Sequence, residues 1–253
     1  MIDTHTHLYL EEFDEDRKEA VKRAQESGVS HLVLPNVGVS TIEPMLAMHH
    51  SFPQYTSVAM GLHPTEVQAD YRDALAEVER HLDGTQYVAI GEVGIDLYWD
   101  TTYRSEQLDA LTTQVQWALN RSLPLIIHCR SGLDEVIEVF SRFKELPPTV
   151  MHSFTGTLSD VKRLRQIGDF YFGVNGIVTY KKSAVPALLP EIGISRILLE
   201  TDSPYLAPVP CRGRRNESAN IPHICRSIAT HLGMSPQEVS AATDSNARAL
   251  LAI

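Results

Sequence analysis

Short apolar runs alternate along the chain with longer amphipathic stretches. Eight of the short runs are rich in apolar or β-branched residues, a pattern typical of buried strands. The predicted strands cover residues 1–8, 30–37, 55–62, 87–94, 123–130, 149–154, 170–176 and 196–202. Helical spacing of apolar residues predicts helices at 11–27, 40–51, 70–82, 103–121, 132–144, 158–168 and 181–190. Two further helices are expected within 217–252, the last beginning at Ser235-Pro236.

This alternation of strand and helix predicts an α/β protein built on a parallel sheet. Eight repeats in 253 residues favour a (β/α)8 TIM-type barrel, whose usual length is about 250 residues. Alternation alone does not establish closure, so a doubly wound open sheet remains the alternative. No linker or low-complexity tract interrupts the pattern, and residues 1–253 are expected to form a single domain.

Composition narrows the class of protein only modestly. No apolar run reaches about 18 residues, so no membrane partner is expected. The N-terminus lacks a basic-then-apolar leader, and the three cysteines are widely spaced, which together favour a cytoplasmic protein with reduced thiols. A net charge of -10 argues against a bulk basic surface that coats nucleic acid. It does not exclude a local phosphate site, because bound cations reverse the field there.

Side chains that commonly bind metals lie at or near the C-terminal ends of the predicted strands. In a parallel barrel these ends meet at one mouth, so side chains from distant strands come together. His5 and His7 are two residues apart on a strand and therefore face the same way. Asp3 shares that face, either orienting a ligand or simply beginning the strand. The set expected to bind metal is His5, His7, Glu92, His128, His152 and Asp202.

The number of these residues predicts two metal ions. One catalytic zinc uses three protein ligands and an open position, so six ligands are too many for it. Two divalent ions that share a bridging carboxylate account for the set, and Glu92 is the natural bridge. Such paired sites recur in phosphatases and nucleases. The ions are expected to be Mg²⁺, Mn²⁺ or Zn²⁺.

An anion site is expected beside the metals. Ser203 followed by Pro204 resembles the start of a helix, and helix N-termini bind phosphate through free N–H groups. Arg130 and the arginines of the later loop would add positive charge, or would simply form a basic surface loop. The arginines of that loop are Arg212, Arg214 and Arg215.

Six motifs, in order and nearly end to end, resemble the TatD-related deoxyribonucleases, metal-dependent hydrolases of the amidohydrolase superfamily. The motifs are Asp3-Thr4-His5-Thr6-His7, Gly61-Leu62-His63-Pro64, the stretch 89–96 around Glu92, the stretch 124–130 ending His128-Cys129-Arg130, His152-Ser153-Phe154-Thr155-Gly156 and Leu199-Glu200-Thr201-Asp202-Ser203-Pro204-Tyr205-Leu206.

The resemblance implies a TIM-type barrel that hydrolyses DNA phosphodiesters, often as a 3′-5′ exonuclease on single strands or 3′ ends. It implies that His5, His7, Glu92 and Asp202 bind one metal. It further implies that Glu92, His128 and His152 bind the second. His63 and Arg130 would then face the substrate. No obligate protein partner is implied.

The resulting mechanistic hypothesis assigns catalysis to Asp202 and Glu92, with Asp202 accepting the proton of a metal-activated water. His63, Arg130 and Ser203 are expected to contact the substrate phosphate. One alternative is hydrolysis of another ester on the same barrel, such as aminoacyl-tRNA or a small phosphoester. The other is a non-catalytic, metal-stabilised binding protein.

Overall fold

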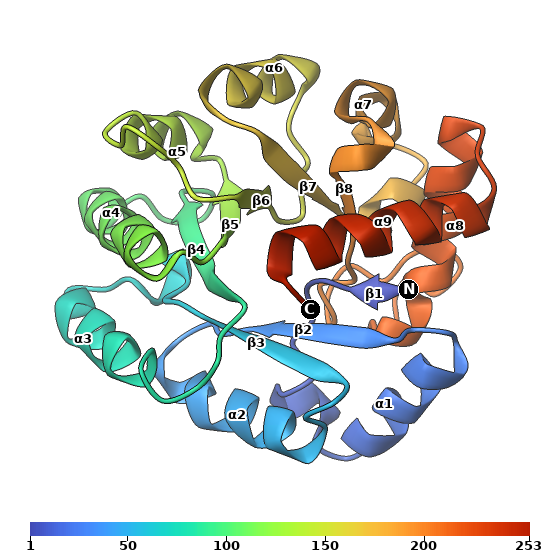
Figure 1. Cartoon of the computed structure of the whole chain (residues 1–253), viewed down its shortest axis with the longest axis horizontal. Coiled ribbons are helices and arrows are strands. Elements are labelled where there is room, and N and C mark those ends of the chain that lie inside the picture. Colours follow the sequence, from blue (N-terminus) through green and yellow to red (C-terminus); the bar gives the residue numbers. More distant parts are fainter.

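The chain folds as a nearly closed barrel of eight parallel strands, each followed by a helix (Figure 1). The computed structural model describes all residues, 1–253. Neighbouring strands pair in chain order from β1 to β8, without the reversal that an open doubly wound sheet requires. The predicted barrel is therefore confirmed. The strands are β1 (Ile2–Asp3), β2 (His31–Pro35), β3 (Thr56–Met60), β4 (Ala89–Asp96), β5 (Leu125–Arg130), β6 (Thr149–Met151), β7 (Phe170–Val174) and β8 (Ile197–Leu199).

Nine α-helices surround the strands, and none is long and apolar enough to cross a membrane. Seven alternate with the strands, and the two expected C-terminal helices are present. The last is capped by Ser235, whose hydroxyl accepts a hydrogen bond from Glu238 N. The helices are α1 (Arg17–Glu26), α2 (Ile42–Ser51), α3 (Tyr71–His81), α4 (Arg104–Arg121), α5 (Leu133–Phe140), α6 (Leu158–Ile167), α7 (Val185–Ile192), α8 (Ile221–Leu232) and α9 (Pro236–Leu251).

Several predicted elements are longer than the observed ones. The helix expected at 11–27 is a short 3-10 turn, Glu11–Phe13, followed by α1. The helix expected at 181–190 begins only at Val185, after a separate 3-10 turn, Gly176–Thr179. β1, β6 and β8 are also short, because hydrogen-bonded pairing stops where the chain turns into the loops of the mouth.

The end of the barrel where the strands begin is filled by apolar side chains and covered by α9. Ala247, Leu250 and Leu251 of α9 pack against inward-facing residues contributed by seven of the strands. Figure 1 shows α9 running inward from the ring of helices towards its centre. Water is thereby excluded from this end, so only the opposite end of the barrel is open for chemistry.

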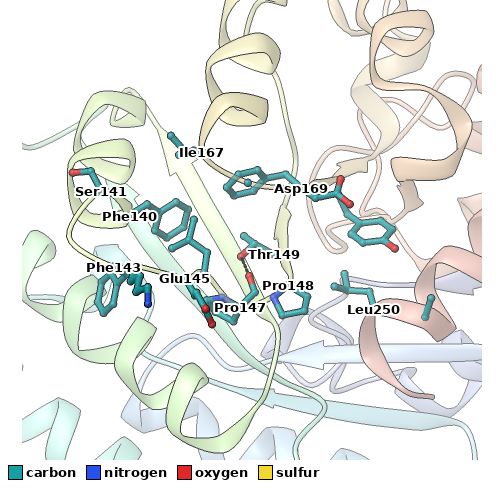
Figure 2. A pocket seen from close by; sticks show the side chains of 16 residues that line it. Phe140, Ser141, Phe143, Glu145, Pro147, Pro148, Thr149, Ile167, Asp169 and Leu250 are labelled. Carbon is teal, nitrogen blue, oxygen red and sulfur yellow. Dashed lines mark hydrogen bonds between the residues drawn. The ribbon is translucent and has the colours of Figure 1, made fainter.

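A cavity of about 620 Å³ also lies at this closed end, outside the barrel. Figure 2 shows its lining, which comes from the ends of α5 and α6, the loops before β6 and β7, and α9. Phe140, Pro148 and Leu250 make much of that lining apolar. No group of potential metal ligands lies there, so this cavity is separate from the candidate metal centre.

The seam between the last strand and the first closes the barrel at the mouth. At the end of β8, Thr4 N donates to Leu199 O at 3.0 Å, and just beyond it Asp202 N donates to His5 O at 2.9 Å. Asp3 is fully buried and holds the two segments together: its carboxylate accepts Thr201 N at 2.9 Å and Thr201 Oγ1 at 2.6 Å. Asp3 therefore ties the barrel together instead of orienting a histidine ring.

We expect Thr201→Val to destabilise the metal-free protein by about 2 kcal/mol, because a buried carboxylate oxygen loses its hydrogen-bond donor. Thr243→Val is the matched control, since buried Thr243 donates to Val239 O, a carbonyl of its own helix. That change should cost less than about 1 kcal/mol. Urea unfolding of chelator-treated protein measures both. Equal losses in the two variants would show that the hydrogen bond from the Thr201 hydroxyl to Asp3 does not stabilise the seam.

Candidate metal centre at the barrel mouth

The six residues expected to bind metal are brought together at the open end of the barrel. They come from five strands or the loops that follow them, as the strand-end pattern predicted. Their positions relative to the strands differ from expectation, however. Glu92 lies inside β4, whereas His5, His7, His152 and Asp202 lie just beyond the ends of β1, β6 and β8.

Glu92 is 3% exposed and lies at the centre of the cluster, with its two oxygens facing different imidazoles. Oε2 lies 3.0 Å from His5 Nε2 and 3.7 Å from His7 Nε2. Oε1 lies 3.0 Å from His128 Nδ1 and 3.7 Å from His152 Nε2. One carboxylate thus lies between His5 and His7 on one side and His128 and His152 on the other, as a bridging ligand between two cations would. His152 also contacts the first pair, because its Nε2 lies 3.6 Å from Asp202 Oδ1 and its ring stacks on that of His5.

Glycine makes this approach of β4 to β5 possible. Gly94 has a φ of +146°, and a Cβ on it would overlap the backbone oxygen of His128. A residue with a side chain would therefore push the two strands apart. The glycine keeps Glu92 and His128 within hydrogen-bonding distance.

The first group has the dimensions of a metal site. His5 Nε2 lies 3.1 Å from His7 Nε2, and Asp202 Oδ1 lies 4.0 and 3.6 Å from these two nitrogens. Ligands about 2.0–2.2 Å from a tetrahedral zinc are separated by roughly 3.3–3.6 Å, close to the distances found here. Two ring nitrogens facing each other at 3.1 Å also need a cation or a proton between them. These residues therefore fit a divalent ion.

Hydrogen bonding fixes which nitrogen of His7 faces the cluster. His7 Nδ1 lies 2.8 Å from Tyr9 Oη, and Tyr9 Oη donates to Pro35 O at 2.5 Å. Burial raises the pKa of Tyr9 well above its usual value, so the phenol keeps its proton. Because that proton goes to Pro35 O, His7 Nδ1–H must donate to Tyr9. The lone pair of Nε2 is left facing Glu92 and Asp202.

Carboxylates also lie beside the outer nitrogens of His128 and His152, as a hydrogen-bond partner of His128 and as a close ionic contact of His152. Asp96 Oδ2 lies 2.9 Å from His128 Nε2, and Glu200 Oε1 lies 3.1 Å from His152 Nδ1. Such outer partners set the orientation and tautomer of metal-binding histidines. In both rings the inner nitrogen is directed at Glu92.

Tyr9, Asp96 and Glu200 are site residues that were not among those predicted from the sequence. Tyr9 lies two residues after His7, as His7 lies two residues after His5. Asp96 lies an even number of residues after Glu92 in β4. Both are therefore on the face that carries the ligands. The two-residue periodicity of the strands could therefore have identified Tyr9 and Asp96 from the sequence. Glu200 has no such signal, since its partner lies 48 positions away: it is 1% exposed, and Gly173 leaves the space that its carboxylate fills.

Glu92 and Asp202 lie in a site with little solvent, where nearby imidazoles stabilise their negative charges. Burial acts to raise the pKa of Glu92, but the imidazoles of His5, His63 and His152 more than offset it and hold the pKa well below its usual value. Burial likewise opposes ionisation of Asp202, whose pKa His152 lowers nonetheless. Both carboxylates are therefore negative at neutral pH.

The surroundings shift the pKa values of His5 and His128 in opposite directions. Burial, helped by nearby His152, lowers the pKa of His5 to about 4, so its ring is neutral and able to bind a metal. Burial also acts to lower the pKa of His128, but Asp96 and Glu92 outweigh it and raise the value to about 9. In the metal-free protein a proton on His128 thus supplies positive charge that a metal would replace.

His63, expected on the substrate side, also reaches this cluster. Its Nε2 lies 3.5 Å from Glu92 Oε1, and with Glu92 and His128 it could hold an ion. Its Nδ1, however, accepts a hydrogen bond from Thr65 N at 3.2 Å. In the neutral ring the proton is therefore on Nε2, which faces the mouth as a donor.

Arg130 and Ser203 have very different surroundings. Arg130 is exposed at the end of β5, and its guanidinium lies over the ring of Tyr98 at 3.7 Å. Ser203 is fully buried and lies 2.7 Å from Thr6 Oγ1 and 2.9 Å from Thr201 Oγ1. Its hydroxyl is therefore occupied within the seam.

The prediction of a helix that begins at Pro204 is wrong. Residues after Ser203 form turns, and no α-helix begins before Ile221. Of the three arginines in this loop, Arg215 pairs with Asp16 at 2.7 Å and Arg212 lies over the ring of Tyr180 at 4.3 Å. Arg214 is exposed and unpaired.

Comparison with known proteins identifies the family of the chain. The family model described as "TatD related DNase" matches residues 2–252. "3'-5' ssDNA/RNA exonuclease TatD" of Pectobacterium carotovorum subsp. carotovorum is 32% identical over 256 residues, with 98% of each chain covered. "Uncharacterized metal-dependent hydrolase YabD" of Bacillus subtilis is also 32% identical, covering 100% of this chain and 99% of that one.

A solved structure shows the same fold. The crystal structure of YJJV, a TatD homologue from Escherichia coli, superposes with a TM-score of 0.91 at 28% identity. The match covers 100% of this chain and 98% of that one. With the family model matching almost every residue, the chain belongs to the TatD-related DNase family of metal-dependent hydrolases.

Proposed function

We propose that this protein is a metal-dependent exonuclease that hydrolyses phosphodiester bonds of single-stranded DNA from the 3′ end. The observation that carries the proposal is the buried carboxylate of Glu92, whose two oxygens face two groups of imidazoles at the open mouth. Family membership and the exonuclease relatives support the choice of substrate.

The proposed metal centre holds two divalent ions. His5, His7 and Asp202 would hold one ion, His128 and His152 the other, and Glu92 would bind both. The histidine nitrogens favour Zn²⁺ over Mg²⁺ and Mn²⁺, which prefer oxygen ligands. Bound there, such ions lower the pKa of a water ligand and polarise a phosphoryl oxygen.

The remaining steps fall to the side chains of the mouth. Asp202 is ionised and 15% exposed, so it can accept the proton that the attacking water loses. His63 Nε2–H and the guanidinium of Arg130 would donate hydrogen bonds to the phosphate as its negative charge grows. Ser203, buried against Thr6, would support the loop instead of touching phosphate.

The proposed catalytic unit is the whole chain, residues 1–253. Ligands come from residues between His5 and Asp202, and the last helix returns to the first strand. Asp244 of α9 accepts a hydrogen bond from Ile2 N at 2.8 Å. Removing α9 would expose the apolar end of the barrel.

A screen of metals against substrates tests the function. Chelator-stripped protein is supplied with Zn²⁺, Mn²⁺ or Mg²⁺ and assayed on 5′-labelled single-stranded DNA, aminoacyl-tRNA and a small phosphoester. We expect shortening of DNA from its 3′ end, stopped by chelator and restored by metal. Turnover of aminoacyl-tRNA alone would identify a different esterase. Tight binding without turnover in every metal would identify a binding protein.

We expect Asp202→Asn to lower kcat on single-stranded DNA by about 10³-fold, because one group serves as both metal ligand and proton acceptor. Asp134→Asn is the control, since Asp134 is an exposed carboxylate that follows β5 and pairs only with Arg163. It should retain nearly full turnover. A folded Asp202→Asn protein with wild-type kcat would exclude the assignment.

We expect Tyr9→Phe to weaken metal binding about 10- to 100-fold, because His7 loses the acceptor that holds its tautomer. Tyr55→Phe is the control: Tyr55 Oη also donates to a backbone carbonyl, Val29 O at 2.9 Å, but has no histidine partner. Competition with a chelating dye measures the affinity for Zn²⁺ without any assay of activity. Equal affinities for the two variants would show that Tyr9 does not orient a ligand.

A further inference from the structure

Large hydrophobic side chains that are exposed occur only on the mouth side of the barrel. All six lie between the end of a strand and the first turn of the following helix. No such residue lies at the closed end. Exposed apolar groups gathered at one face commonly mark a binding surface. The six are Val39, Tyr98, Trp99, Leu158, Tyr205 and Val209.

Tyr98 and Trp99 are the most distinctive of these residues. Trp99 is 80% exposed and Tyr98 is 51% exposed, although each would gain from burial. Their rings meet edge to face with centroids 4.7 Å apart. The guanidinium of Arg130 lies 3.7 Å from the centre of the Tyr98 ring and 5.6 Å from that of Trp99. We call these three side chains the aromatic ledge.

The aromatic ledge is attached directly to the metal centre. Tyr98 N donates to Asp96 Oδ1 at 3.0 Å, and the other oxygen of Asp96 lies 2.9 Å from His128 Nε2. Leu97 N donates to Arg130 O at 2.9 Å, which continues the pairing of β4 with β5 past Asp96. The cavity beside the ledge and the cavity over the metal ligands share Arg130 and His152.

We propose that the aromatic ledge stacks an unpaired nucleobase of the substrate strand, next to the phosphate that is hydrolysed. The inference rests on the proposed nuclease function and names the feature of the substrate that is recognised. Sites for single-stranded nucleic acid combine aromatic faces for bases with cations for the backbone. Bases paired within a duplex are already stacked and cannot occupy the ledge, so the ledge selects single strands.

Charge across the mouth supports a nucleic-acid occupant over an apolar protein partner. Residues 170–190, which include β7 and the segment after it, and residues 203–216, which follow β8, contain no Asp or Glu although the chain has a net charge of -10. The two segments are joined by the bond from Val209 N to Thr179 Oγ1 at 2.8 Å. They carry four exposed cations without an acidic partner: Lys181, Lys182, Arg212 and Arg214. In a barrel of this strand order they lie across the mouth from the ledge, where a phosphate backbone would pass.

Trp99→Ala tests the stacking, with Trp99→Phe as the matched control that keeps a flat ring. The substrates are a single-stranded oligonucleotide and versions with an abasic site at each 3′-terminal position in turn. We expect Trp99→Ala to lower kcat/KM on the intact strand about tenfold and Trp99→Phe to stay within about twofold. When the abasic site is at the stacked position, kcat/KM of the wild-type protein should fall by the same factor of about ten. The Trp99→Ala variant should show no further decrease with that substrate. An equal loss from Trp99→Ala on every substrate would overturn the proposal.

A binding measurement separates this inference from the proposed catalysis. The chain has two tryptophans, and Trp117 is 5% exposed in α4, so Trp117→Phe leaves Trp99 as the sole tryptophan, which is excited selectively over the tyrosines. Chelator-treated Trp117→Phe protein should show Trp99 quenching with the intact oligonucleotide and much less with the abasic one. Base-dependent quenching without turnover in any metal would support base stacking on the aromatic ledge and exclude the nuclease function. Turnover without base-dependent quenching would support the nuclease function and exclude stacking on the ledge. Sedimentation showing that Trp99→Ala dissociates a dimer would assign the ledge to a second copy instead.

Discussion

The seam between β8 and β1 is the constraint on which the site depends. His5 and His7 are separated from Asp202 by nearly the whole chain, and they meet only because the last strand returns to the first. Buried Asp3 makes this junction by accepting both the N–H and the hydroxyl of Thr201. A buried carboxylate is costly unless its hydrogen bonds are satisfied, so the seam has little freedom to slip. The positions of three of the six proposed ligands follow from it.

Once the barrel is closed, the imidazoles are set by groups that would not touch a metal. Tyr9, Asp96 and Glu200 each face the outer nitrogen of a different histidine, and each leaves the inner nitrogen directed at the cluster. The opposite arrangement at His63, where Thr65 N donates to Nδ1, produces a donor at the mouth. One residue type thus has two roles, decided by which neighbour donates and which accepts.

The two ends of the barrel divide stability from recognition. At the closed end, α9 covers apolar side chains from the strands and excludes water. At the mouth, short strands give way to loops that expose aromatic rings, an unpaired arginine and a cationic segment. Surfaces of this kind cost stability, because apolar groups stay in water and like charges stay near one another. The barrel behind them, whose strands pair continuously from β1 to β8, supplies the rigidity that such a surface needs.

The sequence by itself determined the barrel and the identity of the candidate ligands. Alternating strand and helix periodicity depends on local burial, and strand ends in a parallel barrel converge, so His5, Glu92, His128 and Asp202 could be grouped without coordinates. Strand limits were overestimated, and the helix expected after Ser203 is absent, because pairing in the seam outweighs local preference there. Only the tertiary structure decided the contacts that orient the rings of His7, His128 and His152, the distances from each Glu92 oxygen to its imidazoles, and the aromatic ledge. Those depend on distances between segments far apart in the chain, which no local pattern records.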